Sequence, residues 1–492
     1  MSEPPSQPPE AHAAPILIAD RLQDFNDRLS PMLVKELRQG LRAKTFVVVF
    51  LLLQGLLGLV MLTSIAGNAD PARAGTAITR TVFLFYSLAL LVIQPIRGIG
   101  ALHREIDANT IELMVLTRLS AWRIVLGKWL SIASQSALIF TAVLPYLVLR
   151  YWFGEMNLVG ELSLLLLVLL ASCALTAVVI GISAIPSVIV RGLIPLILLG
   201  GSAMPLCGFV LNRDFDDLVA FCSFESTGDF QALLFSIGFG GYMSWITLGV
   251  GASMIAPSAE NHSTARRLVT IGLLVLALIP AVFMTSLTGA DRAILFILLI
   301  APVVFLSLTE RFDLLPPHCA PFVRRGRAGK VMGRLLYPGW PTAVLFSFVV
   351  FGLGLAIYAL APNRNLDLGA RSVVLSLLSS IIFPAALLSL LGIRIEQRFI
   401  QSILILIANA VVVCVLAMIA GALSTGQRGF LWVFSWLPGV GLIQNGFPKD
   451  FSPTSVYVTN IGVFLGYSLI LLITALLKFR EIRKVEASVP AS

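Results

Sequence analysis

The 21 residues from Trp129 to Leu149, WLSIASQSALIFTAVLPYLVL, contain no Asp, Glu, Lys or Arg. A helix needs about 20 apolar residues to cross a bilayer, so this stretch predicts a membrane-spanning helix. Another apolar run, TVFLFYSLALLVIQP from Thr81 to Pro95, precedes it and predicts a second span. The half-polar segment from Asp107 to Lys128 therefore connects two predicted spans.

The composition extends this prediction to the whole chain. Of the 492 residues, 57% are hydrophobic and 12% are charged, and the mean hydropathy is +0.92. A soluble domain carries about 25% charged residues. We therefore expect an all-α, polytopic integral membrane protein. Its polar, Pro-rich beginning lacks the apolar run of a secretory signal and predicts a disordered cytosolic tail over residues 1–29.

Twelve segments are long and apolar enough to be spans, and the pair over 268–309 is joined by a very short loop. They are 46–66, 79–97, 124–148, 160–184, 188–211, 232–255, 268–288, 293–309, 342–361, 372–393, 401–424 and 456–477. The apolar segment 429–442 is short and contains Pro438, so we interpret it as an interfacial or re-entrant element on the outer face, with Trp432 and Trp436 at the headgroups. The alternative is a thirteenth span.

The basic residues indicate the orientation. With both termini in the cytoplasm, 26 of the 35 Lys and Arg residues fall on the inner side, as the positive-inside rule requires. This predicts a multi-pass protein of the cytoplasmic (inner) membrane. The net charge of +9 then reflects topology and contact with membrane lipids, and we expect no nucleic-acid partner.

The polar residues offer little for chemistry. We find no ionisable residue deep inside a predicted span, which disfavours an ion-driven carrier. Gln54, Gln94 and Gln135 are interpreted as interhelical hydrogen-bonding groups. The five cysteines and four histidines show no metal-binding spacing, so no metal or other cofactor is expected. A disulfide between Cys207 and Cys222 is an alternative to free thiols.

The segment PMLVKELRQGLRAKTF, residues 31–46, predicts an amphipathic helix ahead of the first span. Four apolar residues fall within one arc at 100° per residue: Leu33, Val34, Leu37 and Leu41. Lys35, Arg38 and Arg42 form the neighbouring arc, where they would reach lipid phosphates. A helix of this kind lies flat in the inner interface. A simple positively charged anchor is the alternative for this stretch taken alone.

A second short helix is predicted within the connecting segment. Asn109 is a suitable N-cap, and Glu112, three residues later, completes a pattern similar to a capping box. Arg118 falls near the last turn, where a cation suits the helix dipole. The helix between them would expose apolar residues in the cytosol, and such a helix requires a groove on a partner.

These features together resemble the permease subunit of type-2 ATP-binding-cassette (ABC) exporters. The resemblance consists of the elbow-like LVKELRQGLR, a pair of spans, and then E…NTIELMVLTRLSAWRIVLGK, and it covers about residues 30–255. The positions that match the family pattern are Glu105, Thr110, Glu112, Leu113, Leu116, Thr117, Leu119, Ser120, Gly127 and Lys128. Asn109 stands where the family usually has Gly, and Arg118 where it usually has Pro.

The resemblance implies roles for two sets of residues. Residues 109–118 would form the coupling helix that docks on the ATPase, with contacts from Glu105, Thr110, Glu112, Leu113, Leu116 and Arg118. Residues 32–44 would form the interfacial elbow helix, with Lys35, Glu36, Arg38 and Arg42. Because the chain has no GxxxxGK[ST] motif, ATP would be hydrolysed by a separate P-loop ATPase subunit, and the chain itself would not be an enzyme.

The remainder of the chain departs from the family, which commonly has six spans. Residues 256–485 form a second membrane region of about six spans, followed by a cytosolic tail over 486–492. This region is either a diverged repeat, with GKVMGRLLYPGW as a worn elbow, or an added membrane domain. The complex would accordingly contain one chain, a homodimer or a second permease. The sequence does not identify the transported substrate.

Three other functions are alternatives to a permease subunit. The first is a membrane scaffold or assembly protein that keeps the permease fold and transports nothing. The second is a secondary carrier, which would need a site for a coupling ion. The third is an integral-membrane lipid enzyme, which would need a catalytic cluster of polar residues.

Overall fold

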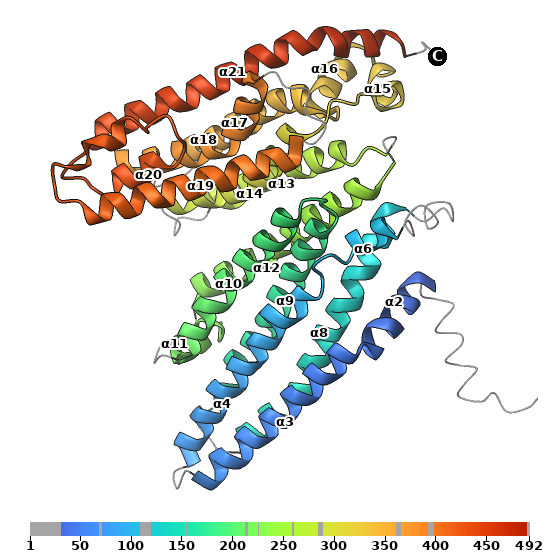
Figure 1. Cartoon of the computed structure of the whole chain (residues 1–492), viewed down its shortest axis with the longest axis vertical. Coiled ribbons are helices and arrows are strands. Elements are labelled where there is room, and N and C mark those ends of the chain that lie inside the picture. The colour runs from blue at the N-terminus through green and yellow to red at the C-terminus, as the bar shows by residue number, and fades with distance from the viewer. Residues whose placement is uncertain are drawn as a thin grey trace, which may run out of the picture.

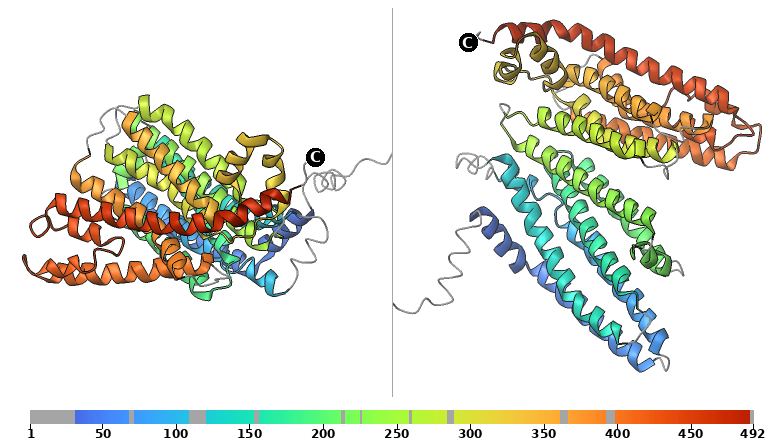
Figure 2. Two further views of the ribbon diagram at one scale, coloured as in Figure 1. Left: turned by 90° about the horizontal axis from the view of Figure 1, so that it is seen from above. Right: turned by 180° about the vertical axis from the view of Figure 1, so that it is seen from behind.

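The computed structural model describes residues 31–67, 71–108, 120–152, 156–211, 215–224, 226–257, 260–283, 289–360, 366–391 and 398–489. Every regular element in these residues is a helix, so the all-α prediction is confirmed. Figure 1 shows that the helices form two bundles, one from the first half of the chain (blue to green) and one from the second half (yellow to red). Figure 2 shows the same two groups from above and from behind.

The first bundle contains α2 (Pro31–Arg42), α3 (Lys44–Gly67), α4 (Pro71–Leu88), η1 (Ala89–Ile93), α5 (Gln94–Ile96), α6 (His103–Asp107), α8 (Ala121–Tyr151), α9 (Leu158–Ser183), α10 (Val188–Leu211), α11 (Phe215–Phe221) and α12 (Thr227–Ile255). The second contains α13 (Ser263–Phe283), α14 (Gly289–Thr309), α15 (Pro316–Val323), α16 (Gly326–Leu336), α17 (Trp340–Leu360), α18 (Leu368–Leu390), α19 (Arg398–Ala422), η2 (Arg428–Trp432), α20 (Val440–Asn445) and α21 (Pro453–Ala487).

Eleven helices in the described residues are long and apolar enough to cross a membrane: α3, α4 with η1 and α5, α8, α9, α10, α12, α14, α17, α18, α19 and α21. The chain is therefore a multi-pass membrane protein. Each of these helices overlaps one of the predicted spans. The remaining predicted span, 268–288, corresponds to α13, which is helical to Phe283 but is not among the eleven. Many apolar side chains on the eleven helices are exposed outward, as lipid-facing helices require.

The second predicted span is not a continuous α-helix. Residues Ala89–Ile93 form a π-helical turn directly before Pro95. A proline lacks the backbone N–H, and its ring collides with the carbonyl group four residues earlier, at Leu91. The wider π turn accommodates this local defect without ending the helix.

The second bundle is held together by polar as well as apolar contacts. Helices α18 and α21 pack against each other over a long stretch, and Asn460 on α21 donates a 2.5 Å hydrogen bond to Ser372 Oγ on α18. On the first bundle, α12 joins this half through Tyr242, whose hydroxyl donates to the Leu299 carbonyl oxygen on α14 at 2.8 Å. The two bundles therefore share an interface that includes buried hydrogen bonds.

Residues 429–442 do not form a spanning helix. They contain most of the short 3-10 helix η2, a series of turns and the beginning of α20. The predicted non-spanning element is thus confirmed, and the thirteenth-span alternative is wrong. Pro438 and the left-handed Gly439, at a φ of 97°, break the helix. Trp432 and Trp436 are exposed, and their location at the headgroups stays a prediction.

The elbow-like sequence before the ninth predicted span also folds as a helix, α16. It packs against α15, α13 and α17, whereas α2 packs along α8, the third span of its own half. The two amphipathic helices therefore have different neighbours in the two bundles.

An ion pair between Arg428 and Asp450, with 2.6 Å between the guanidinium nitrogen and the carboxylate oxygen, stabilises the turn region after α19. Hydrogen bonds from Arg428 and from the Gly426 N–H hold the pKa of Asp450 below its ordinary value. A carboxyl group with a lowered folded-state pKa stabilises the fold above its unfolded pKa, and this contribution disappears as the pH falls through the folded pKa. We therefore predict that Asp450→Asn lowers the melting temperature at pH 7 and that the difference becomes smaller as the pH falls below about 4, the ordinary pKa of an aspartate side chain. Thermal unfolding in detergent between pH 3 and 8 measures this; a pH-independent difference would contradict it.

Candidate functional site

The helix α2 lies close against α8. Ser131 Oγ on α8 donates a 2.9 Å hydrogen bond to the carbonyl oxygen of Glu36. A methyl group placed on Gly40 would overlap the Gln135 amide and would lie 2.7 Å from Ser131 Oγ. The glycine therefore permits the close approach of the two helices, and the predicted elbow helix is attached to the third span along much of its length.

A buried lysine connects α2 and α8 to a third element. Lys128 Nζ lies 2.5 Å from Glu105 Oε1 on α6 and 3.4 Å from Glu36 Oε1 on α2. The lysine side chain comes from α8 and is only 9% exposed. We call these three residues the α2–α6–α8 joint. A buried ammonium group is costly to desolvate, and two carboxylates compensate for that cost.

A second polar contact continues from the joint towards α4, η1 and α5. Arg97, at the end of α5, donates to Gln94 Oε1 at 3.0 Å and also to Gln135 Oε1 on α8. Its guanidinium group stacks over the Phe46 ring of α3, 5.6 Å from the ring centroid. Burial lowers the pKa of Arg97 below its ordinary value. The prediction of an interhelical hydrogen bond is therefore confirmed for Gln135. Gln94 bonds to Arg97 at the end of its own helix, and the buried Gln54 Nε2 has no hydrogen-bond partner among the described residues.

The predicted site residues fall into three groups. Glu36 and Glu105 meet at Lys128, a contact that sequence reasoning missed, although Lys128 was one of the positions matching the family pattern. Lys35, Arg38 and Arg42 are exposed on α2. The remaining residues, Thr110, Glu112, Leu113, Leu116 and Arg118, lie outside the described residues, as does the predicted helix over 109–118.

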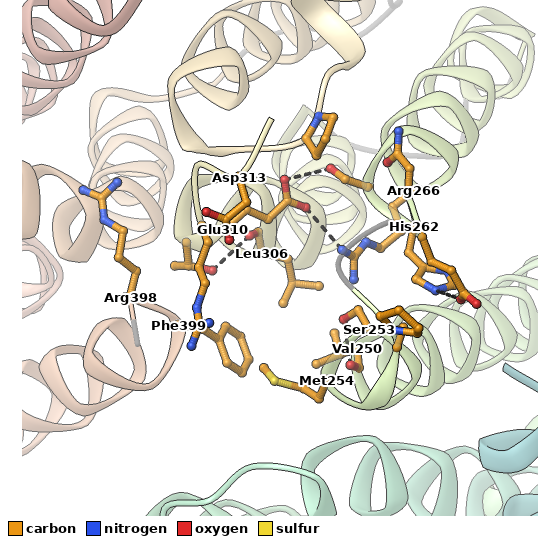
Figure 3. Close-up of a pocket in the computed structure, with 18 of the residues that line it drawn as sticks. Val250, Ser253, Met254, His262, Arg266, Leu306, Glu310, Asp313, Arg398 and Phe399 are labelled. Atoms are coloured by element: carbon orange, nitrogen blue, oxygen red, sulfur yellow. Dashed lines mark hydrogen bonds and ion pairs between the residues drawn. The ribbon is translucent and has the colours of Figure 1, made fainter. Parts of the chain in front are cut away.

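A cavity of about 390 Å³ lies where the ends of α12, α14 and α19 meet, between the two bundles. Figure 3 shows Glu310 and Arg266 joined by an ion pair at one side of this cavity, with Met254 and Phe399 along its apolar side. Glu310 accepts hydrogen bonds from Ser263, Arg266, Arg267 and the Gly339 N–H, at 2.7 to 3.2 Å. Because Glu310 is already satisfied by these donors, its main role is to join α13, α14 and α17.

A smaller cavity of about 150 Å³ lies at the other end of the first bundle, beside α11. Arg150 and Glu161 line it and are 3% and 4% exposed. Arg150 Nε donates to Thr79 Oγ1 at 2.7 Å. Sequence reasoning missed these two residues because Arg150 follows the end of the predicted span 124–148 and Glu161 lies in the first turn of the predicted span 160–184. Their positions on either side of one short loop were the available signal.

The described residues contain no group of three or more His, Cys, Asp or Glu side chains that could hold a metal ion. Cys222 is a free thiol, and burial raises its pKa to about 11. The alternative disulfide with Cys207 is therefore not formed.

No protein-family model, no curated protein and no solved structure matches this chain.

Removing the positive charge from the joint should destabilise the fold. Lys128→Met removes the buried ammonium group from the partly buried Glu36 and Glu105 carboxylates, and we predict a loss of about 3 kcal/mol in the free energy of unfolding. Lys128→Arg should lose much less. The triple variant Lys128→Met, Glu36→Gln, Glu105→Gln should recover most of the loss, because it removes the unpaired charges. Denaturant unfolding in detergent measures the change in unfolding free energy for all three variants. If the change in the triple variant equals the sum of the changes caused by the Lys128 and glutamate substitutions made separately, the three side chains do not interact and the joint is contradicted.

The close contact at Gly40 gives a second prediction with a matched control. Gly40→Ala should destabilise the protein by roughly 1–3 kcal/mol, because the added methyl group displaces Ser131 and Gln135. Gly55→Ala, in α3, meets no atom within 4 Å and should be neutral or stabilising by up to about 1 kcal/mol through helix propensity. Equal effects of the two substitutions on thermal unfolding would contradict close packing at Gly40.

Proposed function

We propose that this chain is the membrane-spanning permease subunit of an ABC exporter-type complex in the cytoplasmic membrane, with both termini in the cytoplasm. ATP is hydrolysed by a separate P-loop ATPase subunit. The observation that carries the proposal is Lys128, placed between Glu105 and Glu36. It supports a mechanical connection between the loop after α6 and the amphipathic helix α2.

The loop after α6 is attached at both of its ends. On one side, Glu105 in α6 contacts Lys128. On the other, the chain continues directly into α8, which carries Lys128 two turns from its start. A partner that displaces this loop therefore moves α8 together with α2, because the three are joined by one buried cation.

The movement of α8 can also be transmitted to the second span, which consists of α4, η1 and α5. Arg97 and Gln135 connect α8 to the end of α5. The π turn over Ala89–Ile93 lies directly before this contact. Such turns often occur at functional positions in helices. In the proposed mechanism, α4, η1 and α5 follow α8 when the loop is pushed, and the first bundle alternates access to its two sides.

In this mechanism the ATPase is contacted by residues of the loop. The resemblance assigns these contacts to Thr110, Glu112, Leu113, Leu116 and Arg118. Glu105 has a different role in the proposal, because its carboxylate is directed to Lys128: it transmits the movement and does not contact the partner. Lys35, Arg38 and Arg42 hold α2 at the membrane interface.

A secondary carrier is a second candidate, favoured by one observation. Arg150 and Glu161 are buried beside a small polar cavity within the ends of α8 and α9. Buried ionisable groups in membrane helices commonly mark paths for ions or solutes. A scaffold without transport activity has no such observation in its favour.

The experiment is affinity purification of the tagged full-length chain in mild detergent, with mass spectrometry of the proteins that copurify. We predict a P-loop ATPase, because the sequence over 109–118 is that of an amphipathic segment, which requires a partner groove. The double variant Glu112→Ala, Leu113→Ala should reduce its recovery at least tenfold. The matched control is Asp217→Ala, Val433→Ala, which removes one exposed acidic and one exposed apolar side chain elsewhere and should leave recovery unchanged.

Two outcomes contradict the proposal. A monodisperse preparation without any ATPase moves the assignment to the carrier, whose test is then uptake by proteoliposomes under an ion gradient, with and without Glu161→Gln. An ATPase retained equally by the loop variant and by the control would show that residues 109–118 are not the docking segment.

A further inference from the structure

The helix α16 exposes two chemically different strips. On a helical wheel, Arg327, Lys330 and Arg334 fall within an arc of about 60°. Val331 and Met332 occupy the neighbouring arc and are 70% and 55% exposed. The third side of the helix is buried: Gly329, Gly333 and Leu336 lie against the rest of the protein. The outward surface of α16 is therefore suited to a boundary between a polar environment, at the basic strip, and an apolar environment, at Val331 and Met332.

The helix is fixed rigidly to its neighbours. Arg334 donates two hydrogen bonds to the Glu486 carboxylate on α21, at 3.1 and 2.6 Å. This contact raises the pKa of Arg334. An apolar cluster that includes Cys319, Tyr337 and Ile482 joins α15, the end of α16 and α21. Helices α15 and α16 and the last turns of α21 therefore form one block, which lies at one end of the second bundle (Figure 1).

This block is strongly basic. Residues 316–336 and 478–489 together contain nine Lys and Arg residues and two Glu residues. Both glutamates are already paired, Glu486 with Arg334 and Glu481 with Lys478. Six basic side chains are exposed: Arg324, Arg325, Arg327, Arg480, Arg483 and Lys484. Asp313 is an exposed acidic residue just before α15. The surface therefore keeps a large excess of positive charge.

The block also lies where the chain enters the membrane. Helix α17, one of the eleven candidate spans, begins at Trp340, four residues after the end of α16. Because this candidate span begins so soon after α16, we expect the block to lie near the headgroups, with Val331 and Met332 towards the hydrocarbon. A soluble acidic partner could bind the charged strip, but the exposed apolar side chains of Val331 and Met332 would stay in contact with water.

We propose that α16 and the basic residues around it form a binding surface for anionic phospholipids. The phosphates would bind Arg324, Arg325, Arg327 and Lys330, and the acyl chains would cover Val331 and Met332. Basic clusters next to a membrane helix attract anionic headgroups, and an exposed apolar strip beside the charges is the pattern of an interfacial helix. This inference does not depend on the proposed transport function.

The test is native mass spectrometry of the full-length protein in detergent, titrated with dioleoyl phosphatidylglycerol or dioleoyl phosphatidylcholine. We expect the wild type to prefer the anionic lipid, and the preference to fall with added salt. Arg325→Gln, Arg327→Gln should reduce this preference roughly tenfold. Arg371→Gln, Lys449→Gln, which removes two exposed basic residues far from α16, should leave it unchanged. The double variant Val331→Ser, Met332→Ser should weaken the binding of both lipids equally, so that the preference for the anionic lipid is kept.

Three results would overturn the proposal. The first is equal affinity of the wild type for the two lipids. The second is a loss of preference in the control variant as large as in Arg325→Gln, Arg327→Gln. The third is an acidic peptide or RNA oligonucleotide that binds through the same arginines while the lipids show no preference, which would assign the surface to a soluble partner.

Discussion

The buried ammonium group of Lys128 constrains the first half of this protein more than any other polar group. Its distances to Glu105 and Glu36 are short enough for direct ion pairs, and water is largely excluded from it. Such a group cannot lose either carboxylate without a large cost. The consequence is geometric: the amphipathic helix α2, the short helix α6 and the long membrane helix α8, which are separate in the sequence, must keep their relative positions when any one of them moves.

The rest of the first bundle is consistent with this constraint. Gly40 allows α2 to approach α8 closely enough for Glu36 to reach Lys128. Arg97 and Gln135 extend the polar contacts to α5, beside the π turn that Pro95 requires. In the second bundle the corresponding amphipathic helix, α16, is fixed to α21 by Arg334 and Glu486 instead. The two halves therefore attach their amphipathic helices by different ion pairs, and only in the first half does the ion pair include α6, which precedes the predicted docking segment.

Much of the fold could be predicted from the sequence because membrane insertion depends on local composition. A run such as Trp129–Leu149 is apolar over a whole bilayer thickness, whatever its neighbours are. The helix before the first span was likewise predictable from its 3.6-residue pattern. The joint was not, because Glu36 and Glu105 lie 92 and 23 positions from Lys128 and no local pattern relates them. Arg150 and Glu161 were also missed, since residues at span ends are ordinarily assigned to the interface.

If α2, α6 and α8 move as one body, the distance between α2 and α6 must stay fixed. Spin labels on the exposed positions Arg38 in α2 and Arg104 in α6 report this distance by pulsed electron paramagnetic resonance in reconstituted protein. We expect one narrow distance distribution in the wild-type background and a broad one when Lys128→Met is added. A broad distribution with Lys128 intact, or one that the substitution leaves unchanged, would contradict this expectation.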